Sequence, residues 1–219
     1  MSDVQIEAGR TRLQGNLQLP EDAGALVLFA HGSGSSRHSP RNQFVARTLN
    51  EAGLGTLLFD LLTKEEEAID MQTREVRFNI HLLAERLGHA TKWAKQQPQM
   101  PDLRFGYFGS STGGAAALVA AVDLSQDVGA VVSRGGRPDL AGEALPKVQA
   151  PTLLIVGGSD DIVIELNEQA RDKMRCKVKL EIIAGATHLF EESGALEKVA
   201  QLASQWFLRQ LTPERRRSE

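Results

Sequence analysis

Residues 103–122 read LRFGYFGSSTGGAAALVAAV, and the centre of this stretch is the pentapeptide GSSTG at residues 109–113. A short apolar run leads into the pentapeptide, which is typical of a buried strand, and a run of small residues leads out of it, as in a closely packed helix. Glycines at both ends are expected because a side chain there would collide with the neighbouring strand or helix. The pattern predicts a strand, a sharp turn and a helix, with Ser111 exposed at the turn as a nucleophile.

Further apolar runs of strand length lie on both sides of this turn. Bounded by Gly, Pro or Asp, they cover residues 25–30, 55–60, 129–132 and 152–156. Such runs are typical of strands buried on both faces of a parallel sheet. Ahead of them, residues 4–8 and 12–19 alternate apolar and polar side chains around a turn at Gly9, which predicts an antiparallel hairpin at one edge of the sheet.

Helical patterns alternate with these strands. Between residues 73 and 97, apolar side chains recur at steps of four and three, and residues 193–210 repeat the pattern. The acidic run at residues 64–67 is expected to start or precede a helix. Because neither a linker nor a repeat interrupts the alternation, we expect one domain over residues 1–219, with helices on both faces of a mostly parallel sheet and a solvated tail at about residues 212–219.

Two further loops carry the partners that a nucleophilic serine needs. One buried strand ends in GGSDD, which puts Asp160 and Asp161 on the following loop, and an alternating strand leads to His188. Since parallel strands bring their carboxyl ends to one edge, both loops are expected beside Ser111. A serine hydroxyl needs a base, and the base needs a carboxylate that fixes its tautomer. We therefore predict His188 as the base and Asp160 as the acid, with Asp161 kept open as the alternative acid.

The loop after the first buried strand reads HGSG and supplies donors for the negative charge of a tetrahedral intermediate. We predict the backbone amides of Ser33 and Thr112 as these donors, with Gly34 as a close alternative to Ser33. His31 is expected to hold this loop in place of transferring protons. The loop also resembles the start of a dinucleotide fingerprint, but an arginine replaces the third glycine, so no cofactor is expected.

The bulk composition excludes several classes of partner. The chain of 219 residues has a formal net charge of -3, which does not favour binding to nucleic acid. Cys176 is the single cysteine and forms no internal disulfide; with neither a signal segment nor an apolar run of about 20 residues, we expect a cytoplasmic protein that does not bind membranes. His38, His81 and His89 do not cluster with carboxylates, so no metal is expected, and a homodimer is compatible with the sequence.

The segments HGSGSSRHSPRN, FGSSTGGAAALVAA, VGGSDDIV and GATHLFEE together resemble the dienelactone-hydrolase-like branch of the α/β-hydrolases. This resemblance covers nearly the whole chain. It implies an α/β-hydrolase sandwich and a cofactor-free hydrolase that acts on carboxylic esters or lactones through a serine or cysteine nucleophile. Dienelactone hydrolase itself carries cysteine where this chain has Ser111, so a general esterase activity is expected in place of its particular lactone substrate.

Only residues 133–150 separate two strands at the point where relatives insert a cap, so we expect no cap domain and a shallow, open site for small esters. Arg134 and Arg137 in this connection are expected at the same sheet edge, where they either bind a substrate carboxylate or phosphate or pair with loop carboxylates. The sequence thus predicts a serine hydrolase that cleaves small carboxylic esters or lactones through an acyl-enzyme. A thioesterase or acyltransferase would use the same triad, and a binding module could keep the fold without catalysis.

Overall fold

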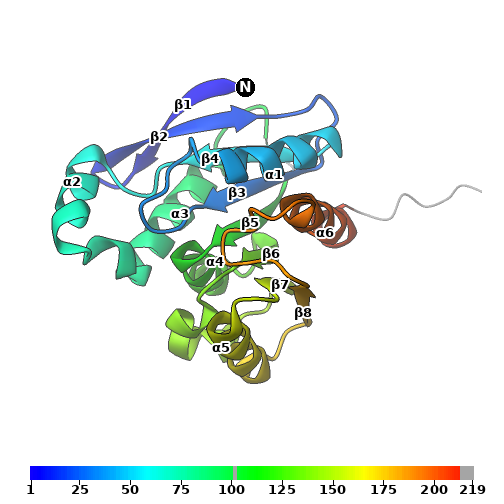
Figure 1. Cartoon of the computed structure of the whole chain (residues 1–219). Coiled ribbons are helices and arrows are strands. Elements are labelled where there is room, and N and C mark those ends of the chain that lie inside the picture. The colour runs from blue at the N-terminus through cyan, green and yellow to red at the C-terminus, as the bar shows by residue number, and fades with distance from the viewer. Residues whose placement is uncertain (101–102, 213–219) are drawn as a thin grey trace, which may run out of the picture.

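The computed structural model describes residues 1–100 and 103–212 of the chain (Figure 1). Its centre is one sheet of eight strands in the order β1-β2-β4-β3-β5-β6-β7-β8. The strands are β1 (Ser2–Ala8), β2 (Thr11–Gln18), β3 (Ala25–Ala30), β4 (Gly55–Phe59), β5 (Arg104–Ser110), β6 (Val128–Arg134), β7 (Thr152–Gly157) and β8 (Val178–Ile183). Only the pairs β1·β2 and β2·β4 are antiparallel. The predicted mostly parallel sheet with an antiparallel hairpin at one edge is confirmed, while residues 213–219 of the predicted tail lie outside the described residues.

Helices cover both faces of the sheet, as predicted (Figure 1). One core lies between the sheet and the helices α1 (Pro40–Glu51) and α6 (Ala195–Leu211). The other core lies on the opposite face, under α3 (Ile80–Lys95) and α4 (Thr112–Asp123). Strand β3 shows why the apolar runs signalled a doubly covered sheet, because all its residues are buried and successive side chains enter opposite cores.

The segment between β4 and α3 differs from the prediction. We expected one helical pattern from residue 73 to residue 97, but α2 (Lys64–Thr73) ends where Arg74 adopts a left-handed backbone with φ 59°. A short 3-10 turn, η1 (Val76–Phe78), follows, and α3 begins only after the Asn79 side chain accepts a hydrogen bond from the Leu82 amide at 3.1 Å. The start of α2 matches the expected role of the acidic run, with a capping box formed at Thr63.

The carboxyl ends of the parallel strands meet at one edge of the sheet, and the loops that follow β5, β6 and β7 lie at this edge. The turn into α4 follows β5, the 3-10 segment η2 (Pro138–Lys147) follows β6, and α5 (Asp161–Lys173) follows β7. None of the helices in the described part of the chain is both long and apolar enough to cross a membrane.

Candidate active site

Ser111 occupies the turn between β5 and α4 in a backbone conformation that residues other than glycine rarely adopt, with φ 50° and ψ -123°. The flanking glycines explain how the turn closes. A Cβ atom on Gly109 would lie 2.4 Å from the Gly113 carbonyl oxygen, and one on Gly113 would lie 2.0 Å from the carbonyl oxygen of Ala30. Strain of this kind costs about 1–3 kcal/mol and persists only where the surrounding structure enforces it.

His188 and Asp160 lie on the two loops where the sequence predicted them, and their side chains are in contact. The distance from His188 Nδ1 to Asp160 Oδ2 is 2.7 Å, and the two side chains are 40% and 18% exposed. In the tautomer with its proton on Nδ1, the imidazole donates to the carboxylate and keeps Nε2 free to accept a proton. Asp161 is instead the exposed first residue of α5, where the positive end of the helix dipole stabilises a carboxylate.

The end of β6 connects these loops to the turn at Ser111. The Ser111 amide donates to the carbonyl oxygen of Arg134 at 3.3 Å. A Cβ atom on Gly135, the next residue, would lie 3.2 Å from the carbonyl oxygen of His188 and 3.5 Å from its Cε1. Within the described residues no hydrogen bond joins the Ser111 hydroxyl to His188, and contacts of this type often tighten only when substrate binds.

The loop after β3 packs directly against the turn at Ser111. A Cβ atom on Gly32 would lie 3.0 Å from the Cβ of Ser111, and Ser33 Oγ lies 3.2 Å from Thr112 Oγ1. Thr112 is the first residue of α4, where helical amides lack an acceptor within the helix. Neither the Ser33 nor the Gly34 amide donates to another residue in the described part of the chain, so both candidates for the second donor stay available.

His31 anchors the loop after β3 through hydrogen bonds to backbone atoms. The ring is buried, its Nδ1 lies 3.0 Å from the Gly32 carbonyl oxygen, and its Nε2 accepts the Leu61 amide at 3.0 Å. These contacts require the neutral ring with its proton on Nδ1, and burial lowers the pKa of His31. Both nitrogens are therefore engaged with backbone, which agrees with a holding role for this histidine.

A cavity of about 330 Å³ opens beside Ser33 and Thr112, on the side of α2. Its apolar wall is formed by Leu61, Leu62, Met71 and Leu83. The expectation of a shallow, open site did not include this cavity. The outer wall of the cavity is formed by α2 and η1, and the conformation of this segment differs from the one that the apolar periodicity predicted. The cavity gives the site a pocket in which one group of a substrate fits.

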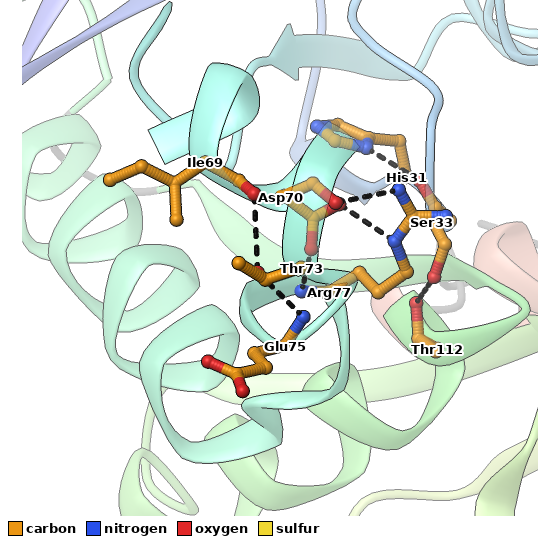
Figure 2. A network of polar contacts seen from close by, with 9 residues as sticks. His31, Ser33, Ile69, Asp70, Thr73, Glu75, Arg77 and Thr112 are labelled. Carbon is orange, nitrogen blue, oxygen red and sulfur yellow. Dashed lines mark hydrogen bonds and ion pairs between the residues drawn. The ribbon is translucent and has the colours of Figure 1, made fainter. Parts of the chain in front are cut away.

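An ion pair that the sequence reasoning missed shapes this cavity. Arg77 donates from its backbone amide to Asp70 Oδ1 at 2.8 Å and from Nε to Asp70 Oδ2 at 2.7 Å, while Nη2 donates to the Asp70 carbonyl at 3.3 Å. Figure 2 shows the Arg77 guanidinium between Asp70 and the loop of Ser33. Asp70 precedes and Arg77 follows the left-handed Arg74, so the spacing of residues along a continuous helix does not predict this ion pair.

The two arginines predicted near the site lie in different environments. Arg137 forms two hydrogen bonds with the Asp139 carboxylate, from Nε at 2.8 Å and from Nη2 at 2.7 Å, which matches the alternative that it pairs with a loop carboxylate. Arg134 is only 7% exposed and lies over the ring of Phe190, with 5.7 Å from Cζ to the ring centroid. It forms no ion pair with any carboxylate of the described residues.

The remaining candidates do not join the site. In the described residues, no three His, Cys, Asp or Glu side chains form a group that could hold a metal ion. Cys176 follows α5 and is half-buried beside Thr152, at the end of β7 away from Asp160, and burial raises the pKa of its thiol.

Comparisons with known proteins agree with the observed fold. The family model described as alpha/beta hydrolase domain matches residues 23–207. A solved structure named as a dienelactone hydrolase from Anabaena variabilis is 58% identical, with a TM-score of 0.94 and coverage of 96% of this chain and 98% of that one. A second solved structure, Est1E from Butyrivibrio proteoclasticus, is 18% identical with a TM-score of 0.79 and coverage of 96% of this chain and 99% of that one, and it supports the fold alone.

Curated relatives carry a different name. Two proteins from strains of Mycobacterium tuberculosis, each described as a putative phosphoribosyl transferase, are 56% identical over 206 residues, which is 94% of this chain. The match covers 46% of the length of each relative, so the chain spans about half of the curated proteins that it matches.

Proposed function

Because the chain belongs to the α/β-hydrolase family, we propose that it is a serine hydrolase in which Ser111 is the nucleophile, His188 the general base and Asp160 the residue that orients the base. The observation that carries the proposal is the 2.7 Å contact between His188 and Asp160 on loops that meet the strained turn of Ser111. A structural role alone would not require a half-buried carboxylate, an imidazole and a strained serine at one sheet edge.

The proposed reaction has two steps. His188 Nε2 accepts the Ser111 proton while the serine oxygen attacks the carbonyl carbon of the ester, and Asp160 stabilises the resulting imidazolium. The amides of Ser33 and Thr112 donate to the oxyanion, which collapses as His188 returns the proton to the departing alcohol. Water then gives a proton to His188 and attacks the acyl-enzyme, which releases a carboxylic acid and restores Ser111.

Small carboxylic esters or lactones are the proposed substrates. The cavity of about 330 Å³ beside Ser33 and Thr112 suits one small to medium group of such a molecule, because both apolar side chains and the Arg77–Asp70 pair line it. The relative named as a dienelactone hydrolase, at 58% identity, supports the ester and lactone class. The name phosphoribosyl transferase belongs to proteins of which this chain matches 46%, and for the matched region we propose hydrolysis instead.

Labelling with a fluorophosphonate probe, followed by mass spectrometry of the peptide, tests the proposal. We expect an adduct on Ser111 that is lost in Ser111→Ala. Ser110→Ala is the matched control, because the Ser110 hydroxyl is buried and donates to Asn42, so labelling should persist. An unlabelled wild-type protein with an intact thermal unfolding transition would contradict an activated serine. Hydrolysis of a panel of short esters and lactones then identifies the acyl group that the cavity prefers.

A further inference from the structure

The carboxyl end of β6 touches all three segments that carry the proposed triad. The carbonyl oxygen of Arg134 accepts the Ser111 amide at 3.3 Å. The next amide, from Gly135, donates to Ile155 in β7 at 2.7 Å, on the strand that leads to Asp160. The Arg134 side chain covers the Phe190 ring, two residues after His188 in the chain. Two consecutive residues, Arg134 and Gly135, therefore link the segments that carry the proposed nucleophile, acid and base.

The state of the Arg134 side chain calls for a physical explanation. Its Nε and Nη1 atoms are buried and have no hydrogen-bond partner among the described residues. Burial and the nearby positive charge of Arg41 lower the pKa of Arg134 to about 10, so the guanidinium keeps its charge at neutral pH. A buried charge without an ionic partner is unfavourable, and the face of an aromatic ring is a remaining source of attraction for it.

Phe190 belongs to a tight turn that includes His188. The Phe190 amide donates to the Thr187 carbonyl oxygen at 3.2 Å, and Phe190 has a positive φ of 57°, which is unfavourable for a residue with a side chain. Phe190 as a whole is 1% exposed, so its ring is enclosed by the residues that pack on it. The guanidinium of Arg134 is one of these contacts, and Gly135 beneath His188 leaves room for the imidazole.

We propose that Arg134 is a positioning residue, whose guanidinium holds the Phe190 ring and thereby keeps the His188 imidazole between Ser111 and Asp160. This inference rests on the proposed function. A direct role in binding a substrate anion fits less well, because two of the three guanidinium nitrogens are buried away from solvent and the other predicted arginine, Arg137, is already paired with Asp139.

Kinetics of four variants test the proposal on two small esters of matched size, one neutral and one that carries a carboxylate. Arg134→Met removes the charge, Arg134→Lys keeps it, Phe190→Leu removes the ring, and the fourth variant combines Arg134→Met with Phe190→Leu. We expect kcat to fall at least tenfold in Arg134→Met, equally for both esters, with KM within twofold, because a small displacement of a catalytic group slows chemistry more than binding. Arg134→Lys should recover part of the loss, and the double variant should be no slower than the slower single variant.

The matched control is Arg47→Met. Arg47 lies over the Phe44 ring at 5.9 Å in a similar contact, but it is exposed on α1 and lines no part of the site, so kcat should stay within twofold. A rise in KM confined to the carboxylate-bearing ester would overturn the proposal and make Arg134 an anion-binding residue. An unchanged kcat in Arg134→Met, or losses that simply add in the double variant, would also overturn it.

A substrate-free measurement separates this inference from the proposed function. In the ¹H–¹³C spectrum of protein labelled at histidine, the His188 ring signal is assigned by its absence in His188→Gln. We expect this signal to shift or broaden in Arg134→Met and Phe190→Leu and to remain in place in Arg47→Met. If the wild type hydrolysed no ester while the signal moved as expected, the proposed function would fail but the positioning of His188 by Arg134 would stand. A signal unchanged in folded Arg134→Met would refute the positioning role itself.

Discussion

Replacing Asp160 with asparagine keeps the size of the side chain that contacts His188 but removes its charge. The carboxylate accepts from Nδ1 at 2.7 Å and is only 18% exposed, so solvent compensates little for its loss. A hydrogen bond to a charged group contributes about 1.5–3 kcal/mol. At about 1.4 kcal/mol for each factor of ten, the lost charge alone slows the reaction by roughly 10- to 150-fold.

The tautomer of His188 adds to this loss. An asparagine amide can donate to Nδ1, which would place the imidazole proton on Nε2, where it blocks acceptance of the Ser111 proton. Together the two effects should lower kcat by about 10³- to 10⁴-fold with little change in KM, as expected for a carboxylate-to-amide change in a triad. The assay is steady-state hydrolysis of a short chromogenic ester, with active enzyme counted by fluorophosphonate titration of the wild type.

Asp161→Asn is the control next door in the chain. Asp161 is exposed at the start of α5 and forms no ion pair within the described residues, so its loss should lower stability by about 0.3–1 kcal/mol through the helix dipole and leave kcat within twofold. If Asp161→Asn caused the larger loss of kcat, the acid would be misassigned. If Asp160→Asn kept full activity, the reasoning about the triad would be refuted.

Three further changes test other parts of the site. Gly113→Ala should destabilise the fold by about 3 kcal/mol or more in urea unfolding, because its Cβ would meet the Ala30 carbonyl at 2.0 Å, whereas Gly24→Ala meets nothing within 4 Å and should be nearly neutral. Burial lowers the pKa of His31, so the neutral ring should contribute its full stabilisation above about pH 6.5 and lose it as the pH falls through the lowered pKa. The free energy of unfolding of the wild type should therefore exceed that of His31→Gln by less at acidic pH. A difference that grew on acidification would contradict this. Asp70→Asn frees Arg77 and should raise KM for esters large enough to fill the cavity but not for acetates; equal effects on both would exclude a role in the cavity wall.

The features that the sequence predicted are those that local sterics determine. The glycines at 109 and 113 are required by contacts with backbone atoms, so their spacing announced the turn at Ser111 before any tertiary information. The order of strands and loops along the chain likewise placed Asp160 and His188 at one edge, since parallel strands allow few other arrangements.

The features that the sequence did not predict depend on contacts between segments. Val76 fits the apolar spacing of α3, but the helix is interrupted at Arg74 and Asn79. The ion pair between Asp70 and Arg77 forms across this interruption. Arg134 and Arg137 looked equivalent in sequence. Their difference comes from the alternation of β6, which turns Arg134 toward Phe190, while Arg137 falls at the start of η2 beside Asp139.

Backbone strain draws these observations together. Within residues 1–100 and 103–212, the non-glycine residues with positive φ are Arg74, Ser111 and Phe190. Arg74 lies between the α2 and η1 residues that wall the cavity, Ser111 is the proposed nucleophile, and Phe190 lies in the turn that includes His188. At about 1–3 kcal/mol each, such conformations would be a large fraction of a typical stability of about 5–15 kcal/mol, so packing around them must hold them in place. We therefore expect the turn of Ser111 and its neighbouring amides to be in position before substrate binds, which is what electrostatic stabilisation of an oxyanion requires.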